Sequence, residues 1–314
     1  MMKNNVYGIL GIGVRNGLWN ADFDGQSKRD GNGIIKGSSY ALQYCIKRQW
    51  DRNHQNIMGL KTMKEDGTCL KIEEKYYKIF HETDKKPTKK KDDYSTILNN
   101  LLKCKDVLHF GVTYTGKPNV NIQGLLQFSE GINLYHDTHE DVEAIITPYA
   151  NQVAKEDKKN ATTGARMLLD EAHYIYDFSL FPKEYDKYIS DNFKGYTKED
   201  YEDFKNQSII AVSNYNSKAK AGCKNEFAMF IETKEDTNYL LDLNCLNEYI
   251  NIYKNNDSDN KIIYDLKIIA ELLNALKEKI DKVEMFYNPR TVEIKGIKKN
   301  DCINIYDLIT REKL

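Results

Sequence analysis

The chain has no paired cysteines at metal or redox spacing and no long apolar segment. Its six cysteines are scattered without a CxxC motif, and several fall inside apolar patterns, which favours reduced core thiols. No run of about 18 apolar residues occurs, so we expect no transmembrane helix and no membrane partner. The first residues lack the apolar segment and cleavage site of a signal peptide. Together these absences predict a cytoplasmic protein.

A dinucleotide-binding fingerprint is incomplete in this chain. Gly8, Gly11, Gly13 and Gly17 suggest one, but Asn16 stands where the third glycine of the motif belongs. No acidic residue ends a second strand about 20 residues further on, as that motif requires. We therefore interpret the segment as a strand whose glycines let another backbone approach closely.

Three small clusters could carry chemistry, and each has a simpler interpretation. His136 and His139 could bind a metal, but their spacing is short and no third cluster is obvious, so we expect none. Asp22 and Asp24 could serve as a metal or acid–base pair, although a solvated loop is favoured because no histidine matches them. The serines at 38 and 39 suit a helix cap better than a nucleophile.

Positive charge is concentrated at the amino end. The first 64 residues hold ten lysines and arginines against four acids, a net charge of +6. The whole chain sums to −1, so the remaining 250 residues carry about −7. Within this region the loop 15–37 is rich in glycine and asparagine and carries Lys28, Arg29 and Lys36. Bare amides and cations suit a phosphodiester backbone, so we predict phosphate contact here, the alternative being a disordered surface loop.

Two further basic segments are candidates for the same role. Residues 132–170 contain Lys158 and Lys159 before Arg166 and Met167, a basic arm with an apolar tip that could wedge between nucleotides or could simply be a loop. Lys218 and Lys220 follow the second helix of the core, where the helix dipole alone would explain them.

The pattern of strands and helices predicts an α+β fold. Strands at 6–14, 106–114, 120–128, 172–180 and 226–232 alternate with helices at 38–52 and 197–217. Without insertions the order is strand, helix, strand, strand, helix, strand, the ferredoxin-like or RRM-like unit. We expect an RRM-like palm from residues 1–52, 106–131 and 171–235. A finger or helical insertion would occupy 53–105, a second insertion 132–170, and a C-terminal α/β extension 236–314. The extension would hold a helix near 268–280 and strands near 283–287 and 291–295.

Four segments together resemble a known family. They are GIGVRNGLWNADFDGQSKRDGNGIIKGSS, NIQGLLQFSEGINLY, DEAHYIYDF and NSKAKAGCKNEFAMF. They resemble the backbone subunit of type I CRISPR Cascade complexes, most closely the I-B branch, within the repeat-associated mysterious protein superfamily. Relatives often carry a proline where Ser27 stands.

The resemblance implies a non-catalytic subunit for antiviral defence that needs no cofactor. Its partners would be the CRISPR RNA, target DNA through that guide, other copies of itself and other Cascade subunits. Residues 132–170 would contain the thumb that kinks the guide, with Arg166 and Met167 as wedges. The candidate RNA-binding residues are Arg15, Asn16, Asn20, Lys28, Arg29, Lys36, Ser38, Ser39, Lys47, Arg48, Gln123, Gln127, Ser129, Lys158, Lys159, Arg166, Met167, Lys218 and Lys220.

Two alternatives remain open from the sequence. Type III relatives cut RNA with an acidic loop residue, so a metal-dependent endoribonuclease using Asp22 or Asp24 is the first. The second is a monomeric RRM-type protein that binds cellular RNA.

Overall fold

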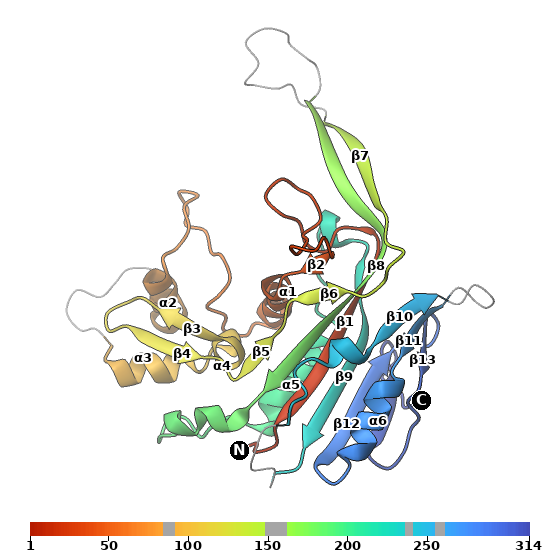
Figure 1. Ribbon diagram of the computed structural model, residues 1–314. Helices are drawn as coiled ribbons and strands as arrows, with labels where there is room; N and C mark the ends of the chain where they lie inside the picture. The colour runs from red at the N-terminus through yellow and green to blue at the C-terminus, as the bar shows by residue number, and fades with distance from the viewer. Residues whose placement is uncertain (84–91, 148–161, 236–240, 255–260) are drawn as a thin grey trace.

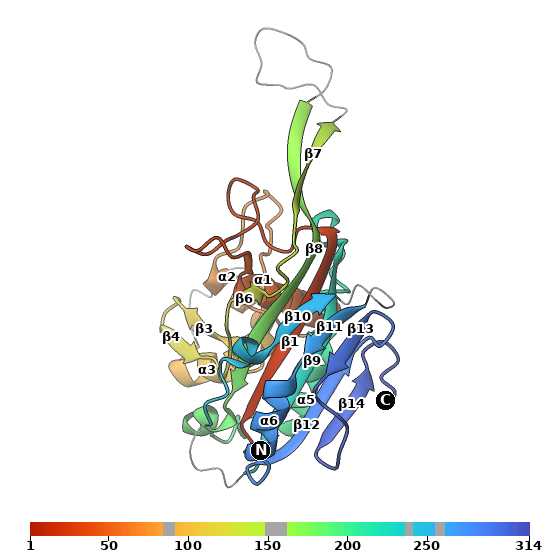
Figure 2. The ribbon, with the colours of Figure 1, turned by 45° about the vertical axis from the view of Figure 1, so that its right-hand side comes forward.

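A computed structural model describes residues 1–83, 92–147, 162–235, 241–254 and 261–314 of the chain. They build one large sheet with layers on both faces, and a two-stranded hairpin projects beyond it (Figures 1 and 2). None of the helices in these ranges is both long and apolar enough to cross a bilayer.

The large sheet has its longest strands at its centre. Its order is β14-β12-β9-β1-β8-β6-β2, and β5 and β7 also pair with β8. The strands are β1 (Val6–Gly17), β2 (Lys36–Gly37), β5 (Leu126–Phe128), β6 (Gly131–Asn133), β7 (Glu140–Thr147), β8 (Thr162–Leu180), β9 (Cys223–Thr233), β12 (Ile280–Tyr287) and β14 (Ile303–Asp307). The central run β9-β1-β8-β5 is antiparallel throughout.

Alternation along the central strands divides the core into two layers. Val6, Leu10 and Val14 of β1 face one apolar cluster, whereas Tyr7 and Ile9 face the other. Successive side chains of a strand point to opposite faces, so a strand buried on both sides contributes to both clusters. The sheet is therefore the middle layer of the molecule.

Helices and the first insertion cover one face. The elements are α1 (Ser39–Arg52), α5 (Lys198–Ser208), α2 (Ile72–His81), α3 (Tyr94–Leu101), α4 (Lys105–Phe110), the two-stranded sheet β3 (Gly111–Tyr114) and β4 (Val120–Gln123), and the 3₁₀ helices η1 (Pro182–Tyr188) and η2 (Lys218–Lys220). Trp50 of α1 and Phe204 of α5 are fully buried in the cluster on this face. Burial of such aromatic surface is the main stabilisation of this layer.

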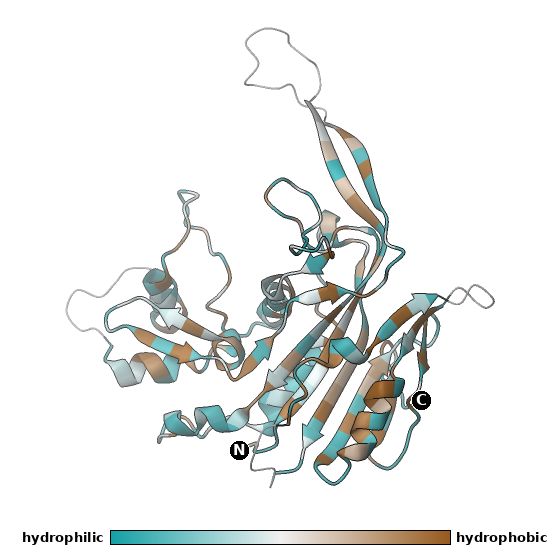
Figure 3. Ribbon diagram, viewed as in Figure 1, coloured by the Kyte–Doolittle hydropathy of each residue, from teal (hydrophilic) through white to brown (hydrophobic). Residues whose placement is uncertain are grey.

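A smaller α/β layer covers the other face. Its elements are η3 (Leu246–Tyr249), β10 (Asn251–Lys254), β11 (Ile262–Asp265), α6 (Lys267–Ala275) and β13 (Val292–Lys295). The strands form a separate sheet in the order β10-β11-β13. Apolar residues of α6 and of the neighbouring strands alternate with polar ones in Figure 3, and Ile269 and Leu273 of α6 are buried in this second cluster.

The projecting hairpin is made by β7 and the first half of β8. Glu140 pairs with Leu169 at its base, and the pairing continues outward to Thr147 and Thr162. Most of β7 is exposed, because beyond the sheet edge it has only β8 as a neighbour. The hairpin is thus an arm built on the longest strand of the sheet.

Several expected elements are confirmed with small shifts at their ends. The helix expected from 38 begins after the cap residue Ser38, whose Oγ accepts from the Tyr40 amide, and it ends at Arg52 as expected. The capping box at Thr197 and Asp200 opens α5. β8, however, begins at Thr162 rather than 172, because β7 supplies a partner for its polar first half.

Other expectations were wrong. Residues 120–128 are not one strand but two, β4 and β5, in different sheets, and the helix expected near 268–280 ends at Ala275, so that Ile280 begins β12. Residues 105–110 are a helix, not the start of a strand: the four successive residues from Asp106 to His109 are all buried, the His109 ring bonds the Lys105 carbonyl four residues earlier, and Gly111, with φ +76°, ends the helix. A short apolar run alone does not distinguish these states. The second helix ends at Ser208 instead of near 217, since the Asn225 side chain accepts from the Val212 amide and donates to the Ser208 carbonyl.

Candidate nucleic-acid interface

A buried aromatic pair fixes the loop 15–37 to the sheet. Trp19 and Tyr176 are both fully buried, and the Trp19 indole donates to the Tyr176 hydroxyl. That hydroxyl also donates to the Ser38 carbonyl at the start of α1, over 3.4 Å. Gly37 and Gly131 leave the room for this pair, because a Cβ at either position would lie within 2.3 Å of Tyr176. The loop and the helix start therefore share one anchor.

The stem of the loop brings three candidate residues together. The Asn20 carbonyl accepts from the Lys28 amide over 3.1 Å, and the Lys28 carbonyl accepts from the Lys36 amide over 2.8 Å. The Asn20 side chain also accepts from the Ser38 amide at 2.7 Å. We call Asn20, Lys28 and Lys36 the stem. Among the described residues no acid lies within ion-pair distance of Lys28.

Carboxylates from distant segments hold the other cations of the loop. Glu130 accepts from the Ser39 amide and hydroxyl, each at 3.2 Å, and lies 4.0 Å from Lys36 Nζ. Glu140, at the base of the hairpin, pairs with Arg29 at 2.8 Å and accepts from the Ser27 hydroxyl. Both carboxylates thus lie where positive charge would attract an anion: Glu130 at the N-terminus of α1 and Glu140 beside Arg29. Sequence reasoning did not identify either glutamate, since their partners lie some 90 residues or more away.

The base of the hairpin lies against the same loop. Met167 is buried, and its sulfur accepts from the Ser27 amide at 3.2 Å. Arg166 donates to the Lys218 carbonyl at 3.3 Å, and Lys220 Nζ lies 4.6 Å from the Trp19 ring centre. The structure therefore gathers Arg166, Lys218 and Lys220 beside the loop. Met167 is buried against the loop in this single chain, so its side chain does not project as an exposed wedge. Lys158 and Lys159 lie outside the described residues.

Other candidates lie apart from the stem or are already engaged. Lys47 Nζ lies 5.6 Å from the Phe110 ring centre. Burial lowers the pKa of Lys47, and the negative charge of Asp106 offsets part of this change. Arg48 pairs with Asp51 at 3.0 Å. The remaining candidates in the middle of the chain are Gln123, exposed at the end of β4, Gln127, whose amide donates to Gly124, and Ser129, whose hydroxyl accepts from the Asp177 amide.

The end of β1 leads into a buried charge network. Arg15 pairs with Glu171 at 3.0 Å, and Asn16 beside it has φ of 48°. His173 lies between Glu171 and Glu226, at 3.2 and 2.5 Å. Burial alone would raise the pKa of Glu226, but the charge and hydrogen bond of His173, together with Lys224 and the Tyr264 hydroxyl, outweigh burial and lower this pKa to about 2. Gly13 leaves the space that the Glu226 side chain occupies, because a Cβ at position 13 would lie 2.7 Å from the Glu226 carboxylate.

The residues considered for metal or acid–base chemistry are dispersed. Asp22 and Asp24 lie on an exposed turn, and His139 pairs with Asp170 at 3.1 Å. Within the described ranges, one group of three carboxylates meets the geometry of a metal site, Glu202, Glu232 and Glu284. Lys205 and Lys282 lie between these acids at 2.6 to 3.0 Å, so the group is a buried ion-pair network.

The site and fold together define a class: an α+β protein with a mixed sheet, an anchored basic loop and a projecting hairpin. The chain belongs to the CRISPR-associated protein Cas7 family, whose model matches residues 4–270. This confirms the family resemblance at the level of Cas7, while the I-B branch stays a prediction. No curated protein matches the chain.

Two solved structures share this fold over almost the whole chain. A chain of a "CRISPR RNA-guided surveillance complex, pre-nicking" is 12% identical, with 96% of each chain covered and a TM-score of 0.58. A chain of a "CRISPR RNA-guided surveillance complex" is also 12% identical, with 96% of this chain and 94% of that chain covered and a TM-score of 0.50. At this identity the likeness establishes the fold alone.

Proposed function

We propose that this chain is the CRISPR RNA-binding backbone subunit of a type I surveillance complex, of the I-B branch. Membership of the Cas7 family supports this proposal, as does a fold shared with chains of two RNA-guided surveillance complexes. Several copies would line one guide RNA, together with other subunits, and the guide would pair with target DNA. The complex would act in the cytoplasm in antiviral defence.

The topology supports an RRM-like palm. The central strands run in the order β9-β1-β8-β5 and are antiparallel. In chain order they are separated by α1 and α5, which lie on the same face of the sheet (Figure 1). This is the arrangement that a strand-helix-strand-strand-helix-strand unit requires. The first insertion then lies between α1 and β5, and the hairpin arm between β5 and β8.

One observation carries the proposal: the stem of the basic loop is held at the foot of the hairpin. Asn20, Lys28 and Lys36 are linked through their backbones, and Arg29 and Ser27 fasten the same loop to Glu140. Such a surface offers cations and polar groups to phosphates, and contacts to phosphates position a nucleic acid without reading its sequence. A subunit that carries guides of many sequences needs this kind of contact, because base pairing reads the sequence.

The variant Lys28→Gln/Lys36→Gln tests this directly. We expect it to bind RNA about tenfold or more weakly, by a similar factor for unrelated sequences, because two charge-assisted phosphate interactions are removed. The slope of log affinity against log salt should fall by about 0.7 for each phosphate of single-stranded RNA that the variant no longer neutralises. Lys183→Gln/Lys198→Gln, two exposed lysines on η1 and α5, is the matched control. Weaker binding confined to one RNA sequence would contradict backbone recognition.

We further propose that the chain binds RNA without cutting it. Incubating the assembled complex with matching RNA and magnesium tests this against the endoribonuclease alternative. Cleavage that Asp22→Ala or Asp24→Ala abolishes would refute the proposal. Light scattering with guide-length RNA separates the remaining alternative, because a monomeric binder would not grow into a long particle.

A further inference from the structure

The loop 15–37 ends in a tip whose chemistry differs from that of its stem. The tip comprises residues 22–25, and Phe23 is the most exposed large apolar side chain of the described residues, at 113% of its reference area. The turn is ordered: the Asp22 amide donates to the Gln26 carbonyl at 2.9 Å, and Gly25 has the φ of +81° that the turn needs. Asp22 and Asp24 flank Phe23 in the sequence, and neither has an ion-pair partner among the described residues. Two carboxylates beside Phe23 disfavour a phosphate partner.

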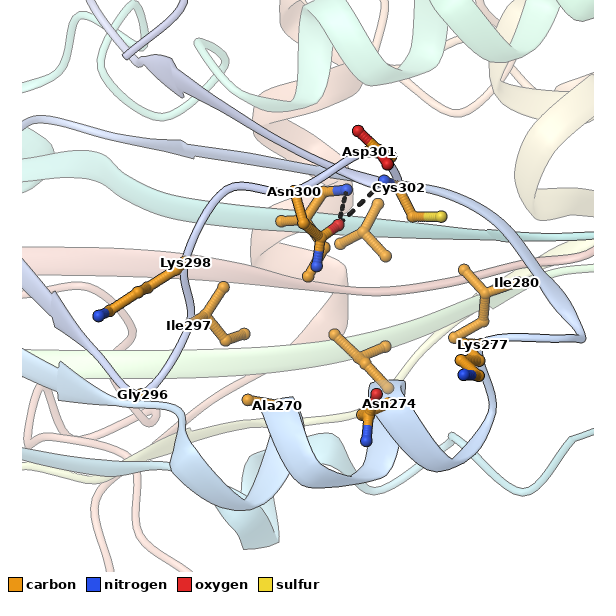
Figure 4. Close-up of a pocket in the computed structure, with 13 residues that line it drawn as sticks. Ala270, Asn274, Lys277, Ile280, Gly296, Ile297, Lys298, Asn300, Asp301 and Cys302 are labelled. Atoms are coloured by element: carbon orange, nitrogen blue, oxygen red, sulfur yellow. Dashed lines mark hydrogen bonds between the residues drawn. The ribbon is translucent and has the colours of Figure 1, made fainter.

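An apolar cavity with a basic rim lies on the C-terminal layer. Its volume is about 500 Å³, and its walls include Leu273 of α6, Ile280 and Val283 of β12, and Ile303 of β14. Figure 4 shows α6 on one side of the cavity and residues 296–302 on the other. A cavity of about 150 Å³ already accepts a benzene ring, so a phenyl side chain fits with room for its turn.

The rim of the cavity carries charges opposite to those of the tip. Lys277 and Lys298 lie at its edge and are exposed. No described acid lies within ion-pair distance of either lysine. Asp301 is also at the edge, so the three charges sum to +1. The rim therefore suits an apolar side chain flanked by carboxylates.

The tip cannot reach the cavity of its own chain. In both views the loop lies beside the foot of the hairpin, while α6 lies over the other face of the large sheet and β14 forms its far edge (Figures 1 and 2). A contact between them must join two copies. The joined pair then keeps one free tip and one free cavity, the heterologous arrangement that gives open chains of subunits.

We propose that Phe23 of one copy inserts into this cavity of the next copy, with Asp22 and Asp24 against Lys277 and Lys298. The inference rests on the proposed function, because it names the contact through which copies on one guide would meet. Burial of one phenylalanine side chain is worth about 1.5–3 kcal/mol, so Phe23→Ala should weaken association between copies about tenfold to a hundredfold.

Cysteine crosslinking tests the contact, because Cys302 already lies at the rim of the cavity. The experiment uses Phe23→Cys in a chain whose other exposed cysteines are removed, Cys69→Ser and Cys245→Ser. Guide-length RNA and a short bismaleimide are added, and the products are separated by denaturing electrophoresis. We expect a ladder of crosslinked copies that Cys302→Ser abolishes. Tyr40→Cys, another exposed aromatic position, is the control and should give no ladder through Cys302.

Charge exchange provides an independent test. Asp22→Lys/Asp24→Lys and Lys277→Glu/Lys298→Glu should each associate poorly alone, because each places like charges at the contact. Mixed together they should associate again, because every tip then meets a cavity rim of opposite charge. Restored association in the mixture supports the proposal, and its absence would overturn it.

A short RNA that holds one copy separates this contact from RNA binding itself. Phe23→Ala should bind that RNA within about twofold of the unaltered chain and lose only growth on longer RNA. An equal loss on the short RNA would show that Phe23 stacks on a base, and would refute the contact between copies. Failure of the unaltered chain to bind any RNA would refute the proposed function. The crosslink from position 23 to Cys302 would then still decide whether copies make this contact.

Discussion

Ion pairs at the basic loop differ from those between α5 and the large sheet. Arg29 and Glu140 keep 42% and 27% of their side-chain surfaces exposed, whereas Lys205 and Glu284 keep 5% and 10%. A pair open to water costs little to separate, but a buried charge that loses its partner remains desolvated. The exposed pairs can therefore exchange their carboxylates for phosphates, while the buried network serves the fold.

The largest expected effect comes from removing a buried cation. Lys205→Met should lower the free energy of unfolding by about 3–5 kcal/mol, because Glu284 then keeps only Lys282 as a partner in a buried site. Lys36→Met, which removes the half-buried partner of Glu130, should cost less than about 1 kcal/mol, because the two charges are 4.0 Å apart and both keep contact with water. Urea denaturation measures both. Similar losses in the two variants would remove the distinction between the regions.

The buried carboxyl group of Asp177 should make the stability of the fold depend on pH, which an exposed carboxyl group would not do. Burial raises the pKa of Asp177 to about 7, although the Asn247 amide opposes this. Because its folded pKa lies above its ordinary value, its contribution to stability is greatest in acid and is lost as the pH rises through about 7.

Asp177→Asn cannot ionise, so it should gain of the order of 2 kcal/mol on the unaltered chain between about pH 5 and about pH 8. Thermal unfolding at both pH values checks this, with Asp51→Asn, an exposed acid, as the control. A pH-independent difference would contradict the assignment.

The smallest expected effect comes from Glu130, the half-buried glutamate beside the basic loop. Glu130→Gln removes the negative charge beside Lys36 and the Ser39 amide, so RNA affinity should rise about threefold to tenfold. Stability should change by less than about 1 kcal/mol. Glu184→Gln, from an exposed pair with Lys187 on η1, should leave RNA affinity unchanged. Weaker RNA binding by Glu130→Gln would show that this carboxylate positions the loop and does not compete with phosphate.

Local signals in the sequence predicted the parts of the fold that depend on neighbouring residues. The cap at Ser38, the capping box at Thr197 and the strand from Val6 were recognisable because their determinants lie within a few residues. The helix at 105–110 was not, because its short apolar run fits either state and its burial against α5 is a tertiary effect.

The candidate site was predictable only in part for the same reason. Composition identified the basic loop, and the structure gathers its lysines with Arg166, Lys218 and Lys220. Glu130 and Glu140 were missed because nothing in the sequence around Lys36 or Arg29 indicates which distant acid pairs with it. The glycines of β1 were expected to allow close backbone approach. Gly17 fits this, but Gly13 instead admits the Glu226 side chain.

Ultraviolet crosslinking of the RNA-bound protein, followed by identification of the crosslinked peptides, tests the central claim most directly. We expect crosslinks within residues 15–21 and 26–39 and at the foot of the hairpin near Arg166. Crosslinks confined to the opposite layer, around β10, β11 and α6, would contradict it.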